Sequence, residues 1–140
     1  QRGRRLDPTK FRRSELVRFQ HCDPAGIVFY PRFVEMVNAT VEDWWADVVG
    51  ASFADIHIDR NTALPTASLN VEFKSPARLG DRLDLEVTVS RLGRTSITLI
   101  VTALCSHRTI FCATVTHVFV SKDDFRPVPW PDEYRNKILL

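Results

Sequence analysis

The segment 21–33 carries the residues best suited to chemistry. It reads His-Cys-Asp-Pro-Ala-Gly-Ile-Val-Phe-Tyr-Pro-Arg-Phe, so its one carboxylate, Asp23, lies in a turn that contains proline and glycine. Pro31 is suited to open a helix, because its missing N–H would have no partner in the first turn. The free N–H groups of a helix start favour negative charge. A carboxylate beside such a start suits a hydrolytic site, in which the N–H groups hold an oxyanion.

The same pattern also fits an ordinary structural turn, in which Asp, Pro and Gly are the common residues. Other kinds of site are not indicated. The four histidines show no metal-ligand spacing, and no G-x-S-x-G motif is present; they are His21, His57, His107 and His117. The last of these shares a predicted strand face with apolar residues, which favours a core or interface histidine. We therefore predict no metal site and no Ser-His-Asp triad.

Length and charge narrow the class of protein. A chain of 140 residues fits one domain. No apolar run approaches the ~18 residues of a membrane span, and the N-terminus lacks the apolar run of a signal peptide. We therefore expect a cytoplasmic protein without a membrane partner. Residues 1–13 hold six basic residues and one acid, a charge of +5, which leaves −3 for the rest of a chain whose net charge is +2.

The basic segment 1–13 is predicted to be a flexible tail. No basic patch with interspersed aromatic residues follows it, so we do not predict nucleic-acid binding. The three cysteines, Cys22, Cys105 and Cys112, are odd in number and lack C-x-x-C spacing. This argues against a disulfide scaffold or a zinc site. Cys105 and Cys112 flank a predicted turn and could face each other, but reduced buried thiols are favoured.

The apolar pattern predicts one long helix and one antiparallel sheet. A helix is expected from Pro31 to Val49, ended by Gly50, because apolar residues recur at helical spacing; they are Phe33, Val37, Val41, Trp44 and Val48. Alternation of apolar and polar residues predicts strands at Thr66–Phe73 and Arg82–Leu92. Further strands are expected at Glu15–Gln20, at Thr95–Leu104, which is apolar on both faces in part, and at Ile110–Ser121. Ala51–Leu64 is expected to be irregular, and prolines 127, 129 and 131 to preclude regular structure in the tail. Helix and sheet must bury their apolar faces on each other, which gives an α+β fold.

The run Cys-Asp-Pro-Ala-Gly-Ile-Val-Phe-Tyr-Pro at 22–31 closely resembles the signature of the 4-hydroxybenzoyl-CoA thioesterase family of hotdog-fold enzymes. Phe73–Asp81 is similar to the start of the family's third strand, and Pro131–Tyr134 is similar to its ending. The resemblance implies a hotdog fold, a curled antiparallel sheet of about five strands wrapped around a long central helix. It also implies a single domain over residues 14–140.

The resemblance implies an acyl-CoA thioesterase that releases free acid and CoA from an aromatic (4-hydroxybenzoyl-like) or short-chain acyl-CoA. No cofactor is expected, since coenzyme A is part of the substrate. Asp23 would act as nucleophile or as general base, which the sequence leaves open. The backbone N–H of Tyr30 would hold the oxyanion. Gly26 would let the loop approach the substrate, or would simply be a turn glycine.

Further residues follow from the same resemblance. His21 would tune Asp23 or bind substrate, or would only end a strand. Arg91 and Arg94 lie where the family binds the CoA phosphates, although they would equally suit a solvated hairpin. We expect a homodimer or homotetramer. Two other functions stay open, hydrolysis of acyl carrier protein thioesters and binding of acyl-CoA without cleavage.

Overall fold

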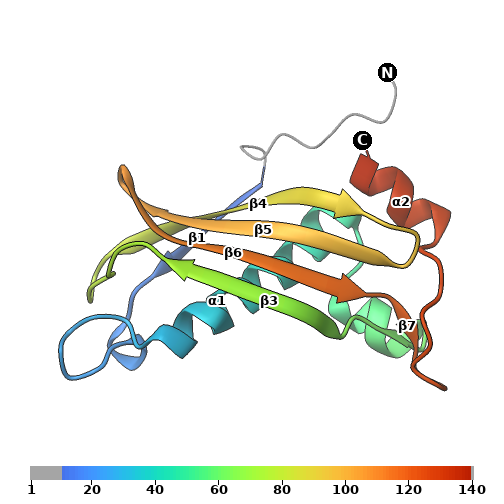
Figure 1. Ribbon diagram of the computed structural model, residues 1–140, viewed down its shortest axis with the longest axis horizontal. Coiled ribbons are helices and arrows are strands. Elements are labelled where there is room, and N and C mark those ends of the chain that lie inside the picture. Colours follow the sequence, from blue (N-terminus) through green and yellow to red (C-terminus); the bar gives the residue numbers. More distant parts are fainter. Residues whose placement is uncertain (1–10, 140) are drawn as a thin grey trace.

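A computed structural model describes residues 11–139 and shows one sheet packed on one long helix (Figure 1). Strand β1 spans Arg12–Leu16, and helix α1 spans Tyr30–Trp44 and continues as a π-helical turn to Val49. The strands after it are β2 (Thr62–Ala63), β3 (Thr66–Phe73), β4 (Arg82–Leu92), β5 (Ser96–Cys105), β6 (Arg108–Val118) and β7 (Val120–Ser121). Helix α2 (Asp132–Leu139) closes the described chain.

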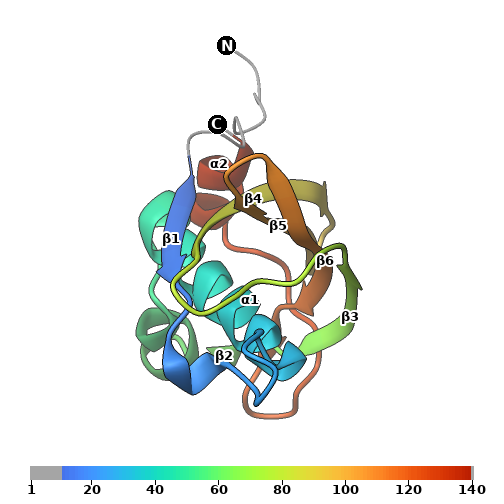
Figure 2. The same cartoon turned by 90° about the vertical axis from the view of Figure 1, so that its left-hand side faces the viewer.

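The main sheet has the order β1-β4-β5-β6-β3, and every neighbouring pair is antiparallel. Strands β2 and β7 form a separate short pair. Seen end-on, the sheet curves over α1 from β1 on one side to β3 on the other (Figure 2). The α+β class, the number of strands in the main sheet and the wrapped helix all agree with the prediction.

The core lies between α1 and the concave face of the sheet. The predicted helix stripe is buried at Phe33, Val37, Val41 and Trp44, and Val48 is half-buried. These residues meet the inward side chains of the long strands, among them Leu83, Leu85, Leu99, Val101, Ala113 and Val115. Gly50 ends the helical segment with φ of +80°, a left-handed conformation that glycine adopts without a Cβ penalty.

Two predicted segments differ from the structure. The first strand lies earlier than Glu15–Gln20, because Phe19–His21 forms a 3-10 turn. The tail after Pro131 forms α2, which the prolines were expected to prevent. Pro131 directly precedes this helix, and proline is tolerated at a helix start. Tyr134 of α2 is buried, with its ring centroid 5.8 Å from that of Trp45.

Two other expectations are refined. Arg12 and Arg13, assigned to the flexible tail, belong to β1, while residues 1–10 lie outside the described residues. Cys105 pairs with Arg108 and Cys112 with Thr102, so the two cysteines do not face each other, and both are free thiols, as is Cys22. No helix within 11–139 is long and apolar enough to cross a membrane.

Strand β3 is an edge strand whose apolar face is largely uncovered. The predicted alternation holds from Leu69 to Phe73, but a register shift between Thr66 and Ser68 places Thr66, and not the expected Ala67, opposite the inward His117. Leu69 is 42 % exposed and Phe73 is 50 % exposed. On the neighbouring strand β6, the inward residues Ala113 and Val115 are buried. The sheet therefore presents an apolar margin beside α1.

Candidate active site

The loop that carries Asp23 is closed by its own backbone. The Asp23 N–H donates to the carbonyl of Ile27 at 2.9 Å, and the Gly26 N–H donates to the carbonyl of Asp23 at 2.9 Å. Ile27 also forms a β-bridge with Arg78, and the Val28 N–H donates to the Ala77 carbonyl at 2.9 Å. These bonds tie the loop to the segment before β4 and fix the backbone of Asp23.

The Asp23 side chain is half-buried and only partly engaged. Its Oδ1 accepts a hydrogen bond from the N–H of Ala25 at 2.8 Å, which is the usual Asx turn. Its Oδ2 has no hydrogen-bond partner among the described residues. One carboxylate oxygen thus remains free to attack a carbonyl carbon or to accept a proton from water.

Helix α1 starts with a free backbone donor. Phe29 occupies the N-cap position without a side-chain cap, and Pro31 lies in the first turn. The Phe29 N–H donates to the carbonyl of His21 at 2.9 Å, whereas the Tyr30 N–H meets no acceptor within residues 11–139. A free N–H at the positive end of a 15-residue helix suits an oxyanion.

Aromatic side chains surround this helix start. Phe29 and Tyr30 are 49 % and 61 % exposed, and the Tyr30 ring centroid lies 6.0 Å from that of Phe73 on β3. Phe33 continues the cluster inward, 5.0 Å from Phe111. The exposed rings form an apolar surface beside the Asp23 loop, and a flat apolar ligand can pack there.

His21 and Gly26 have clear structural roles. His21 is buried, and its Nδ1 accepts a hydrogen bond from the N–H of Arg18 at 2.8 Å. This bond favours the structural interpretation of His21 over direct contact with substrate. Gly26 has φ of +81°, and an added Cβ would meet nothing within 4 Å in the protein. Its backbone conformation therefore explains the glycine.

Arg91 and Arg94 are not near Asp23 within one chain. They are exposed at the β4–β5 turn, where the Arg94 carbonyl accepts from the N–H of Trp130 at 3.1 Å. This turn and α2 lie at the opposite end of the molecule from the start of α1 (Figure 1). The basic residue placed beside the Asp23 loop is Arg78, through its bridge with Ile27.

The structure also groups residues that the sequence did not bring together. His117 on β6 is buried, and it lines a pocket with Asn38 of α1 and Thr66 of β3. The only signal in the sequence was a histidine among apolar residues on one strand face. No group of three or more His, Cys, Asp or Glu side chains within 11–139 is arranged to hold a metal ion.

Comparison with known proteins decides the family. Residues 17–138 match the model of the thioesterase-like superfamily. The chain belongs to this superfamily. The expected relationship to hotdog-fold acyl-CoA thioesterases is thus confirmed, and with it the class of enzyme, a thioester hydrolase.

Individual relatives are distant but cover most of the chain. A 1,4-dihydroxy-2-naphthoyl-CoA hydrolase from Acaryochloris marina is 27 % identical over 126 residues, which is 86 % of this chain and 89 % of the relative. The crystal structure of a thioesterase superfamily protein from Jannaschia is 29 % identical with a TM-score of 0.84, covering 91 % of this chain and 90 % of the other. The structure of a gentisyl-coenzyme A thioesterase named BH1999 is 22 % identical with a TM-score of 0.81, covering 89 % and 99 %. This last likeness concerns the fold alone.

Proposed function

We propose that this thioesterase hydrolyses aromatic acyl-CoA thioesters at the start of α1. The observation that carries the proposal is the juxtaposition of a partly free carboxylate, an unpartnered helix N–H and a cluster of exposed aromatic rings. The relatives also support an aromatic acyl group, because the hydrolase from Acaryochloris marina is named for 1,4-dihydroxy-2-naphthoyl-CoA, an aromatic thioester. An aromatic acyl group would pack on Tyr30, Phe29 and Phe73.

The proposed reaction uses the Tyr30 N–H as a hydrogen-bond donor and the Asp23 carboxylate as nucleophile or base. The thioester carbonyl oxygen would accept the Tyr30 N–H, which stabilises the negative charge that develops on this oxygen. In one route, Asp23 attacks the carbonyl carbon, CoA thiolate leaves, and water cleaves the resulting anhydride. In the other, Asp23 takes a proton from water as the water attacks. Rapid-quench mass spectrometry separates them, because only the first route adds the mass of the acyl group to the enzyme.

The experiment that tests the site is the substitution Asp23→Asn. It keeps the Asx-turn acceptor but removes the carboxylate, and loss of a general base alone costs ~10²–10⁴-fold in turnover. Asp124→Asn, in an exposed turn far from the loop, is the matched control. Thiol release from benzoyl-, 4-hydroxybenzoyl-, phenylacetyl- and C2–C12 acyl-CoA gives the rate. An Asn variant as active as the control would show that the chemistry lies elsewhere, and a wild type inactive on every thioester would favour a binding protein.

We further propose that two chains pair through β3. Its uncovered apolar face and open edge are unusual for a monomer, because exposed edges invite pairing. A two-fold contact between two antiparallel β3 strands would extend the sheet across both chains and bring the partner chain beside Leu69 and Phe73. A homotetramer would need a second contact elsewhere on the dimer.

The proposed role of Arg91 and Arg94 then involves two subunits. They lie too far from Asp23 to serve the site of their own chain, so they would hold the CoA phosphates of a neighbour's site. Charge-assisted contacts of arginine with phosphate are strong and specific. The alternative for phosphate binding within one chain is Arg78, which is bridged to Ile27 of the Asp23 loop, together with Lys74, which directly follows β3.

A further inference from the structure

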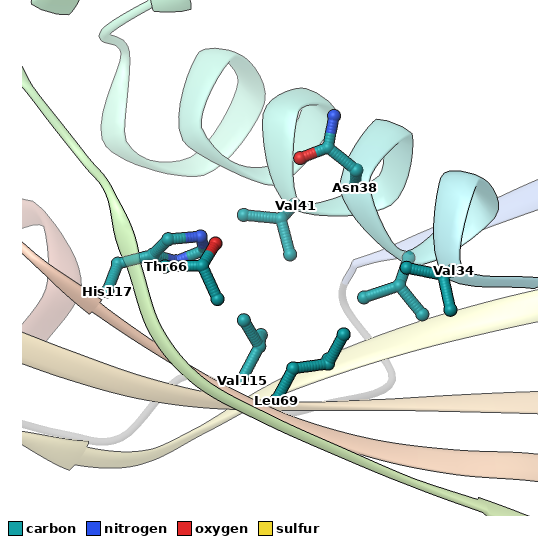
Figure 3. Close-up of a pocket in the computed structure, with 8 residues that line it drawn as sticks. Val34, Asn38, Val41, Thr66, Leu69, Val115 and His117 are labelled. Atoms are coloured by element: carbon teal, nitrogen blue, oxygen red, sulfur yellow. The ribbon is translucent and has the colours of Figure 1, made fainter. Parts of the chain in front are cut away.

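A small pocket opens between α1 and the β3–β6 end of the sheet (Figure 3). Its volume is about 60 Å³, and its walls are mainly apolar, with Val41, Leu69 and Val115 among them. Three polar side chains also line it: Asn38 comes from the helix, and Thr66 and His117 come from paired positions of β3 and β6. No lysine, arginine or carboxylate lines the pocket, so it suits an uncharged group.

His117 is the least explained of these residues. It is 4 % exposed, and its Nδ1 is buried without a hydrogen-bond partner among the described residues. Burial, assisted by the nearby His57, lowers the pKa of His117 to about 4, so the ring is neutral near pH 7. A neutral imidazole has one N–H donor and one acceptor nitrogen. Buried polar groups without a partner are rare, and each one calls for an explanation such as a ligand or water.

The two other polar groups lie on the solvent-exposed side of the pocket. Thr66 is directly opposite His117 in the β3–β6 register, so the two side chains lie on the same face of the sheet. Figure 3 shows the Asn38 side chain at the rim of the pocket, extending from α1 away from Val115 and Leu69, with its oxygen on the side of His117. A hydroxyl both donates and accepts, as do all three side chains. A single hydroxyl placed among them can therefore give the buried Nδ1 of His117 its missing hydrogen-bond partner.

The pocket lies along the same helix as the candidate oxyanion donor. Asn38 is eight residues after Tyr30, which is about 12 Å of helical rise. Along β3, Phe73 is the fourth residue after Leu69, about 13 Å of strand, and the Phe73 ring is 6.0 Å from that of Tyr30. A single ring attached to the thioester carbonyl is shorter than this. Only the far end of an extended acyl group reaches the pocket from the same chain.

We propose that the pocket formed by Asn38, Thr66 and His117 binds an uncharged hydroxyl at the far end of an extended acyl group, such as a two-ring aromatic one. The inference rests on the proposed thioesterase function and adds the part of the acyl group that the enzyme selects. His117 and Thr66 would be specificity residues without a part in the bond cleavage.

The kinetic test compares two nearly isosteric substrates whose two linked rings give the acyl group the length to reach the pocket, 4′-hydroxybiphenyl-4-carbonyl-CoA and 4′-methylbiphenyl-4-carbonyl-CoA. The wild type should prefer the hydroxyl, and His117→Phe and Thr66→Val should each lower the ratio of the two kcat/KM values about 10-fold or more, as expected when a hydrogen bond to a substrate hydroxyl is lost. Thr114→Val, on the outer face of β6, is the matched control and should keep the ratio. 4-Hydroxybenzoyl-CoA tests the reach, because the substitutions should leave its kcat/KM within about twofold. Unchanged hydroxyl-to-methyl ratios in both variants would overturn the proposal, as would an equal effect on 4-hydroxybenzoyl-CoA.

A binding measurement keeps this inference separate from the proposed function. In wild-type protein labelled with ¹⁵N-histidine, 2-naphthol should shift the His117 ring nitrogens in a saturable way, and 2-methylnaphthalene should not. The Thr66→Val variant should weaken this binding, even if His117→Phe does not fold. A wild type that hydrolyses no thioester yet binds 2-naphthol at His117 would refute the thioesterase proposal alone. A His117 signal that does not respond to 2-naphthol shows that the pocket holds only water, and the inference fails.

Discussion

Because His117 is buried, it should make the folded protein less stable as the pH falls below neutrality. The pKa of the ring is lowered from 6.5 to about 4, chiefly because burial disfavours the charged form, and secondarily by His57. In the unfolded chain the ring regains its ordinary pKa. Above pH 6.5 the ring is neutral in both states and the shift has no effect. As the pH falls below 6.5, the unfolded chain binds a proton that the folded chain does not, so the folded state loses stability until about pH 4.

The size of this effect follows from the gap between the two pKa values. At about 1.4 kcal/mol per pH unit, the gap between 6.5 and about 4 amounts to roughly 3 kcal/mol. This loss is a large part of the free energy of unfolding, which is typically about 5–15 kcal/mol. His117→Phe removes this titration, so the difference in unfolding free energy between the variant and the wild type should change by about 3 kcal/mol between pH 7.5 and pH 4.

Urea unfolding of wild type and variant, at one protein concentration across that pH range, measures the difference directly. Constant concentration matters because oligomers gain stability with concentration. His107→Ala, at an exposed turn, controls for the loss of an ordinary histidine. Parallel pH profiles for wild type and His117→Phe would refute the reasoning, and so would an NMR titration in which the His117 ring protonates near 6.5.

Three further predictions concern the loop, the nucleotide and the assembly. Gly26→Ala places a Cβ at φ of +81°, which costs about 1–2 kcal/mol, so turnover should fall and the thermal midpoint measured by calorimetry should drop by roughly 3–10 °C; an unchanged midpoint and rate would show that the left-handed backbone is not needed there. Arg91→Ala/Arg94→Ala should raise KM for acyl-CoA but hardly change it for an acyl-pantetheine without the nucleotide, and the effect should fade with salt because exposed charges are screened over ~8 Å; an equal loss on both substrates would indicate a structural role and direct attention to Arg78 and Lys74. Light scattering at micromolar concentration should show a dimer or tetramer, with Leu69→Lys shifting it toward monomer and Asn70→Lys, on the opposite strand face, leaving it assembled; a wild-type monomer would contradict the β3 contact.

The segments that could be predicted from the sequence are those whose ends are marked by residues with a strong local preference, such as proline and glycine. Pro31 and Gly50 delimited the long helix, because one residue suits a helix start and the other a left-handed end. Alternation over Thr66–Phe73 and Arg82–Leu92 gave the bounds of β3 and β4. In contrast, the prolines before Asp132 suggested an irregular tail. Helix α2 is stabilised by Tyr134 against Trp45, a contact between residues far apart in the sequence.

In the same way, one part of the candidate site could be predicted from the sequence and the other part could not. Asp23 and Gly26 lie in one loop closed by its own hydrogen bonds, and Tyr30 opens the helix that follows, so a contiguous motif identifies them together. The pocket of Asn38, Thr66 and His117 is assembled from a helix and two strands that meet only after folding. No local spacing relates these three residues, and their value as a site depends on burial that a sequence does not show.

Edge strand β3 connects these observations. Its uncovered apolar face carries Phe73 beside the start of α1 and Leu69 in the pocket of His117. A single chain leaves this face to water, although burying apolar surface is the main source of folding and association free energy. Both a partner chain and an acyl group are therefore proposed to contact this apolar face. Apolar side chains pack against many kinds of acyl group, so selection among acyl groups should consequently depend on the few polar side chains beside them, Asn38, Thr66 and His117.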